Sequence, residues 1–124
     1  MQYRNEASVP AAPAVALALA GVGKRYQGAT AETAALDDVS FSIARGEFVS
    51  VIGPSGCGKS TLFNIIGGLI EEYDGAVLLD GARIAGPHQQ IAMVFQEEST
   101  FPWRTTLENV AFGLEIRGVP RAER

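Results

Sequence analysis

Hydrophobic and polar positions alternate over several short stretches in the first half of this chain. Val39, Phe41 and Ile43 are separated by small residues, the period of two that indicates a half-buried β-strand. Aliphatic runs at 15–20, 48–52 and 91–95 favour further strands, and the β-branched run 48–52 is expected to be a buried one. Residues 27–35, rich in Gly, Thr and Ala, are expected to form a loop.

The hydrophobic period changes to that of a helix in two places. Apolar residues at helical spacing predict a helix over 59–69, weakened at its end by two glycines. Thr105 and Glu108 form a capping box, and the apolar stripe after them predicts a second helix that stops at Gly118. Pro120 suits the first turn of another helix. Between the two helices, 75–81 is predicted to be a strand whose closing Asp-Gly pair signals a hairpin.

The composition is that of a globular protein, and the net charge does not favour a surface that binds nucleic acid. Hydrophobic residues make up 47% of the 124 residues and charged residues 19%, as in folded proteins. The net charge of -4 argues against nucleic acid as a partner. With a single cysteine, Cys57, the chain forms no internal disulfide, which fits a reducing compartment.

The amino-terminal region offers two interpretations. Residues 10–21 are the only candidate for a signal peptide, because 14–20 is wholly apolar. Residues 1–13 show no periodicity and are interrupted by two prolines, and we favour a flexible leader there, followed by the first strand. No run reaches the roughly 18 apolar residues that a membrane-spanning helix needs.

A glycine-rich motif stands between the predicted strand 48–52 and the predicted helix 59–69. It matches G-x-x-x-x-G-K-[ST] in full. The matching residues are Gly53, Pro54, Ser55, Gly56, Cys57, Gly58, Lys59 and Ser60, followed by Thr61. The glycines let successive N–H groups converge, and the helix adds its free N–H groups and the positive end of its dipole. A lysine there can reach the β- and γ-phosphates, and the serine hydroxyl can bind Mg²⁺. The motif therefore predicts a nucleotide-phosphate site.

Cys57 lies inside this loop, near Lys59 and a helix N-terminus. Such a position can lower a thiol pKa and make the thiol reactive. Since the loop binds phosphate through its backbone, an incidental side chain is the interpretation we favour.

The sequence around the loop resembles that of ATP-binding-cassette ATPases. The similarity lies in 36–43, 46–49 and 53–62, in the Gly-Ala-Val-Leu-Leu-Asp-Gly stretch 75–81, and in Met-Val-Phe-Gln at 93–96, which resembles the family's Q-loop. Phe101-Pro102-Trp103 and 106–110 continue this match, and Phe101-Pro102-Trp103 with 109–114 after it is most similar to importers of nitrate, sulfonate, taurine and related anions. Thr100 and Arg104 depart from that pattern, since leucine is more usual there.

The resemblance implies an α/β P-loop NTPase of the ABC ATPase type that binds ATP and Mg²⁺. It divides the chain into the leader 1–13, the N-terminal part of a nucleotide-binding domain at 14–103, and the start of a helical subdomain at 104–124. The antiparallel β-subdomain and the P-loop strand, loop and helix belong to the second part. The implied partners are a membrane permease that meets the Q-loop region, a second ATPase subunit and, indirectly, a substrate-binding protein. The implied location is cytoplasmic, on the inner face of the plasma membrane.

Individual roles also follow from the resemblance. Lys59 and Gln96 are the implied catalytic residues, Ser60 and Gln96 the Mg²⁺ contacts, and Tyr26 the aromatic that stacks on adenine. The alternatives are a buried strand-end aromatic for Tyr26 and a surface polar residue for Gln96. Phe101, Pro102 and Trp103 are expected near the permease contact, and a core role for Trp103 stays open.

Other residues invite a functional interpretation that their context does not support. The apolar run 76–79 and Asp80 look like a Walker B strand, but Gly81 follows and the segment precedes Gln96, so a hairpin is expected. Glu97 and Glu98 are expected in a solvated loop, and His88 in a loop without ligands.

Three functional hypotheses remain: an importer ATPase subunit, a nucleotide-binding or permease-contacting module without turnover, and another P-loop NTPase such as a kinase or GTPase. The family's signature sequence, Walker B aspartate, catalytic glutamate and switch histidine are absent from these 124 residues. The 124 residues are therefore expected to bind ATP without hydrolysing it, and to be marginally stable or prone to aggregate by themselves.

Overall fold

The structure, a computed structural model, describes residues 14–28, 31–96 and 99–124. Contacts divide the chain into two compact units, Met1–Ala92 and Met93–Arg124, which are described separately. The predicted leader 1–13 and the pair Glu97 and Glu98 lie outside the described residues.

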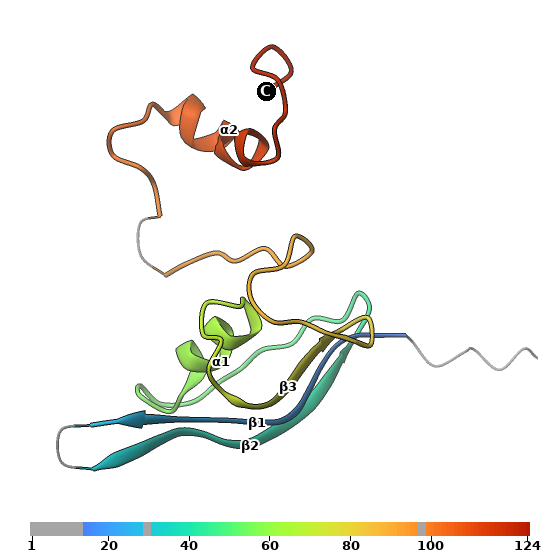
Figure 1. Cartoon of the computed structure of the whole chain (residues 1–124), viewed down its shortest axis with the longest axis vertical. Coiled ribbons are helices and arrows are strands. Elements are labelled where there is room, and N and C mark those ends of the chain that lie inside the picture. The colour runs from blue at the N-terminus through green and yellow to red at the C-terminus, as the bar shows by residue number, and fades with distance from the viewer. Residues whose placement is uncertain (1–13, 29–30, 97–98) are drawn as a thin grey trace, which may run out of the picture. The chain divides into compact units, whose positions relative to one another are not determined.

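The first unit is built on an antiparallel sheet of four strands in the order β2-β1-β3-β4. The strands are β1 (Val15–Gln27), β2 (Glu32–Ala44), β3 (Asp74–Leu79) and β4 (Ala82–Arg83). Helix α1 (Lys59–Ile66) lies over one face of the sheet (Figure 1). The predicted hairpin is confirmed: Leu79 pairs with Ala82, and the turn residues Asp80 and Gly81 have φ of 49° and 80°, as in a type I′ turn.

The first two strands are longer than predicted, and most of the expected loop 27–35 is strand. β1 runs to Gln27 and β2 begins at Glu32, with Tyr26 opposite Thr33. The N–H of Gly28 donates to the carbonyl of Ala31 at 3.0 Å and closes the connection. Cross-strand pairing has overridden a composition that by itself indicates a loop.

Two predicted strands, 48–52 and 91–95, are not strands in the structure. Phe48 is 90% exposed, Ile52 91% and Val94 99%, and only Ile91 of the two segments packs partly against the core. Neither pairs with another strand among the described residues. A segment rich in β-branched and aromatic residues forms a strand only beside a hydrogen-bonded neighbouring strand. The hydrophobic pattern of 48–52 and 91–95 does not show whether such a neighbour exists, and both predictions were wrong for that reason.

The core of the first unit lies between the sheet and α1. It consists of aliphatic residues from three strands, the helix and the segment after β4: Leu19, Val22, Leu36, Leu62, Ile65, Val77 and Ile84. The predicted helix 59–69 is confirmed in place but ends at Ile66, and the chain then turns through Gly67 and Gly68. This core anchors the helix whose first residues follow the glycine-rich loop.

The second unit contains α2 (Thr106–Ile116) and the turn that precedes it. The predicted capping box is present, since the N–H of Glu108 donates to Thr105 Oγ1 and the N–H of Thr105 donates to Glu108 Oε2. The Asn109 side chain also bonds Phe101 and the carbonyls of Arg104 and Thr105. After Gly118, residues 121–123 form a turn and not the helix that Pro120 suggested.

Candidate phosphate-binding site

The glycine-rich loop turns directly into α1, and Gly58 is the residue that allows the turn. Gly58 is the N-cap of α1 with φ of 94°, a left-handed conformation that residues with a side chain rarely adopt. A Cβ added there would lie 2.3 Å from the carbonyl oxygen of Ala35 in β2. The loop is therefore pressed against β2 at this point, which sets its position relative to the sheet.

The backbone N–H groups of the loop are open to a ligand. Within the described part of the chain, the N–H groups of residues 56–60 donate no hydrogen bond to a protein acceptor. The first bond of the helix ladder comes from Leu62 N–H to the Gly58 carbonyl at 2.9 Å, and no side chain caps the helix start. Unpaired N–H groups at a helix N-terminus attract an anion.

The Lys59 ammonium is held inside the loop. It donates to the carbonyl oxygens of Gly53 at 2.8 Å and Pro54 at 2.7 Å. It also lies 3.5 Å from the Cys57 sulfur, and that thiol is exposed. The charged residue of the motif is thus positive and lines the hollow, which adds to the attraction of the open N–H groups.

A hollow of about 160 Å³ opens at this point, lined by Ala35, Gly56, Gly58, Lys59, Ser60 and Thr61. Its volume is below the roughly 300–1,000 Å³ of a typical pocket for a complete small-molecule ligand, so it suits phosphate groups alone. Ala35 was missed by sequence reasoning because it fell in the expected loop, and only the register of β2 reveals it.

Ser60 is the motif residue expected to bind a divalent cation, and it lines the hollow beside Thr61. No cluster of three or more His, Cys, Asp or Glu side chains that could hold a metal occurs among the described residues. Mg²⁺ binds oxygen and is commonly held by one or two protein groups together with phosphates. The residues present fit that kind of site.

Tyr26 lies on β1, beside the part of β2 that contacts the loop. It pairs with Thr33, two residues before Ala35 on β2, and is 43% exposed. Gln96, by contrast, belongs to the second unit and is exposed there. The first unit thus brings Tyr26 and the P-loop onto the same stretch of β2.

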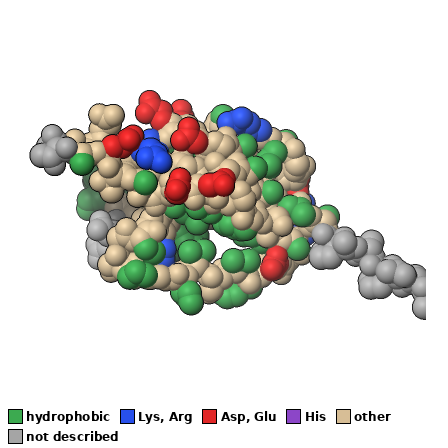
Figure 2. Space-filling model, turned by 90° about the horizontal axis from the view of Figure 1, so that it is seen from below, with side chains coloured by type: hydrophobic (Ala, Val, Ile, Leu, Met, Phe, Trp, Pro, Cys, Tyr) green, Lys and Arg blue, Asp and Glu red, His purple; other side chains and the backbone are tan. Residues whose placement is uncertain are grey.

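Asp80 and His88 lie where the sequence predicted, in a hairpin turn and in a loop. Asp80 lies in the β3–β4 turn and forms an ion pair with Arg45. His88 lies in a loop, where its Nδ1 accepts from the N–H of Gln90 at 3.3 Å. Figure 2, seen from below, shows acidic side chains in red beside basic ones in blue on the visible surface.

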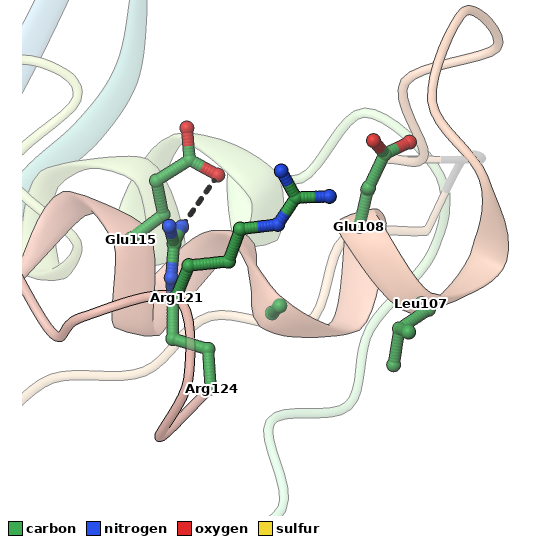
Figure 3. A pocket seen from close by; sticks show the side chains of 6 residues that line it. Leu107, Glu108, Glu115, Arg121 and Arg124 are labelled. Carbon is green, nitrogen blue, oxygen red and sulfur yellow. Dashed lines mark ion pairs between the residues drawn. The ribbon is translucent and has the colours of Figure 1, made fainter.

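A hollow of about 340 Å³ lies beside α2 in the second unit (Figure 3). Two of its charged residues, Glu115 and Arg124, form an ion pair at 2.9 Å, and Glu115 also accepts from Arg104 at 3.1 Å. The hydrogen bond from Arg104 lowers the pKa of Glu115, and the bonds from Thr105 lower that of Glu108. These bonds stabilise the second unit.

The glycine-rich loop that leads directly into α1 is typical of the P-loop class of α/β nucleotide-binding proteins. Comparison with known proteins narrows this class. Residues 36–124 match the family model described as "ABC transporter". The chain belongs to the ABC transporter family, and its fold is that of the family's ATP-binding cassette.

Two curated relatives and one solved structure illustrate the match. A taurine import ATP-binding protein, TauB, of Chromobacterium violaceum is 48% identical over 83% of this chain and 39% of its own length. An aliphatic sulfonates import ATP-binding protein, SsuB, of Bacillus cereus is 44% identical over 78% of this chain and 39% of its own. The cassette MJ0796, solved as a dimer in a post-hydrolysis state bound to ADP and Pi, superposes with a TM-score of 0.73. That structure is 36% identical, and the match covers 85% of this chain and 48% of the other.

The chain thus spans less than half the length of the relatives it matches.

Among the described residues, no helix combines the length and apolar character needed to cross a membrane.

Proposed function

We propose that this chain is the nucleotide-binding part of the ATP-binding subunit of an ABC importer. The observation that carries the proposal is the P-loop itself, with its open N–H groups, its enclosed Lys59 ammonium and its phosphate-sized hollow. In this proposal the N–H groups and Lys59 bind the β- and γ-phosphates of ATP. Ser60 contributes a hydroxyl to Mg²⁺, and Tyr26 stacks on the adenine.

The substrate proposed for the importer is a small anion such as nitrate, a sulfonate or taurine. The names of the relatives from Chromobacterium violaceum and Bacillus cereus support this class. The Phe101-Pro102-Trp103 turn supports it as well, because it is the part of the sequence most similar to those importers.

The partners proposed are a membrane permease, a second ATPase subunit and, indirectly, a substrate-binding protein. Trp103 supports a protein contact near Gln96, since its indole is 77% exposed and a large exposed aromatic is typical of interfaces. The dimeric MJ0796 cassette supports the second subunit. The corresponding location is the cytoplasmic face of the plasma membrane.

For these 124 residues by themselves we infer binding of ATP without turnover. No carboxylate is among the described residues that line the phosphate hollow, and hydrolysis needs a group that orients or activates water. Phosphate release from ATP at a rate that Lys59→Ala abolishes would contradict this inference.

The binding proposal is tested by calorimetric titration of Mg–ATP into the chain and into Lys59→Ala. Loss of a charge-assisted contact is expected to weaken binding about tenfold or more. Arg117→Ala is the matched control, because it removes an exposed positive charge from the second unit and should leave the affinity unchanged. Equal affinities for the wild type and Lys59→Ala would refute the proposed site.

The role of Ser60 is tested by repeating the titration with Ser60→Ala, with and without Mg²⁺. The variant is expected to bind Mg–ATP more weakly than the wild type and to bind ATP in the presence of a chelator equally well. An equal loss under both conditions would show that the hydroxyl acts on the loop and not on the metal.

A further inference from the structure

Lys24 makes two contacts that join the end of β1 to the segment after α1. Its ammonium donates to the backbone carbonyl of Glu72, and it lies 5.4 Å from the centroid of the Tyr26 ring. A cation within about 6 Å of an aromatic centroid is attracted to the ring face. Lys24 is half-buried, whereas Tyr26 is 43% exposed.

These contacts lie close to the P-loop through β2. Lys24 pairs with Leu36 and Tyr26 with Thr33. Gly58 approaches the same strand, where an added Cβ would meet the Ala35 carbonyl at 2.3 Å and Leu36 Cδ2 at 3.0 Å. Thr33 and Ala35 are about 7 Å apart along an extended strand. The Tyr26 ring and the phosphate hollow therefore lie against one short stretch of β2.

Lys24 contacts the aromatic ring and is not among the residues that line the phosphate hollow. The positive charge at the loop is that of Lys59, which makes its own bonds to Gly53 and Pro54. The two lysines thus have different partners: Lys59 contacts the P-loop, and Lys24 contacts the Tyr26 ring. A change at Lys24 should act on whatever the ring binds.

We propose that Lys24 is a positioning residue for the nucleotide base, holding the Tyr26 ring in place on one face so that its other face is ready for adenine. The inference rests on the proposed function. An exposed tyrosine loses rotameric freedom when a base stacks on it, and a ring that is already restrained loses less. The Glu72 carbonyl in turn fixes the ammonium, so that the restraint comes from the folded first unit.

The test compares ATP with inorganic tripolyphosphate, which has the phosphates but no base, by calorimetric titration with Mg²⁺. Lys24→Gln removes the cation but keeps an N–H donor for the Glu72 carbonyl. It is expected to weaken ATP binding about two- to fivefold, the range of a cation–π contact at a partly exposed site, and to leave tripolyphosphate binding unchanged. Lys24→Arg, which keeps a cation, is expected to restore the affinity for ATP.

Arg25→Gln is the matched control. Arg25 is the neighbouring cation, and it contacts the carboxylates of Glu32 and Asp37, each at 3.9 Å, and not the tyrosine ring. Its loss is expected to change neither affinity. Tyr26→Leu is the second control, because in that background Lys24→Gln should weaken ATP binding no further.

Three results would overturn the inference: an equal loss of ATP and tripolyphosphate binding in Lys24→Gln, unchanged ATP binding, or a loss that persists without the Tyr26 ring. Failure of the proposed function has a different outcome, in which the wild type binds neither ligand or Lys59→Ala binds both like the wild type. Melting temperatures of all variants report whether the first unit stays folded.

Discussion

Close backbone contacts in the first unit depend on single glycines. At Gly68, where the chain leaves α1, φ is 74° and an added Cβ would lie 2.1 Å from the carbonyl carbon of Gly86. Gly46 has a similar φ of 80°, but nothing lies within 4 Å of its added Cβ. Comparing substitutions at Gly68 and Gly46 therefore separates the energetic cost of the positive φ from that of the close contact.

Gly68→Ala is expected to destabilise the first unit by more than about 2 kcal/mol, because two backbone segments must move apart. Gly46→Ala is expected to cost about 1 kcal/mol, from the left-handed conformation alone. Urea unfolding of both variants measures the difference. Equal destabilisation would mean that the contact between Gly68 and Gly86 has little weight.

At the scale of the element, α2 could be predicted from sequence because its signals are local. The capping box joins residues three apart, and the structure confirms it between Thr105 and Glu108. The predicted strands 48–52 and 91–95 failed for the opposite reason. Strand formation depends on a neighbour that the local pattern does not reveal. β1 and β2 are longer than predicted for the same reason, because their length depends on the pairing between them.

The capping box makes α2 sensitive to acid. The hydrogen bonds from the Thr105 N–H and hydroxyl hold the pKa of Glu108 below its ordinary value of 4.5. A lowered folded-state pKa means that this stabilisation is complete above about 4.5 and is lost as the pH falls through the folded-state value. The helical signal of α2 in circular dichroism is therefore expected to decrease in that acid range.

Glu108→Gln is the control for this titration. A glutamine can occupy the same capping position but does not ionise in this range. The acid-dependent loss of helix should be smaller in this variant, and what remains should come from other carboxylates such as Glu115, whose pKa is also lowered. An identical pH profile in the two proteins would contradict the capping account.

At the scale of the whole molecule, apolar side chains on 48–52 are exposed instead of packed. Phe48 and Ile52 are not part of the core, so their replacement removes apolar surface without creating a cavity. The double variant Phe48→Ser, Ile52→Ser is expected to reduce self-association in sedimentation velocity and to change the free energy of unfolding by less than about 1 kcal/mol.

Ile65→Ser provides the contrast, because Ile65 is fully buried in the core under α1. It is expected to destabilise the first unit by about 3 kcal/mol or more and to increase association. If the surface variant associated as strongly as the wild type, the exposed segment would not be what drives association.

The candidate site was predictable in part. The P-loop, Lys59 and Ser60 follow from a motif whose members are adjacent in sequence, and the structure confirms the helix start after the loop. Ala35 and the Lys24–Tyr26 contact depend on the register between β1 and β2 and on the return of the chain at Glu72. Such contacts between distant segments have no local signal.

The central claim is that the backbone N–H groups of the P-loop bind the phosphates of a nucleotide. Amide chemical shifts of residues 56–60, followed by NMR as Mg–ATP is added, test it most directly. The account predicts large shifts for these amides in the wild type, and shifts for the same amides with tripolyphosphate. If ATP shifted other amides while those of 56–60 stayed unchanged, the P-loop would not be the nucleotide site of this chain.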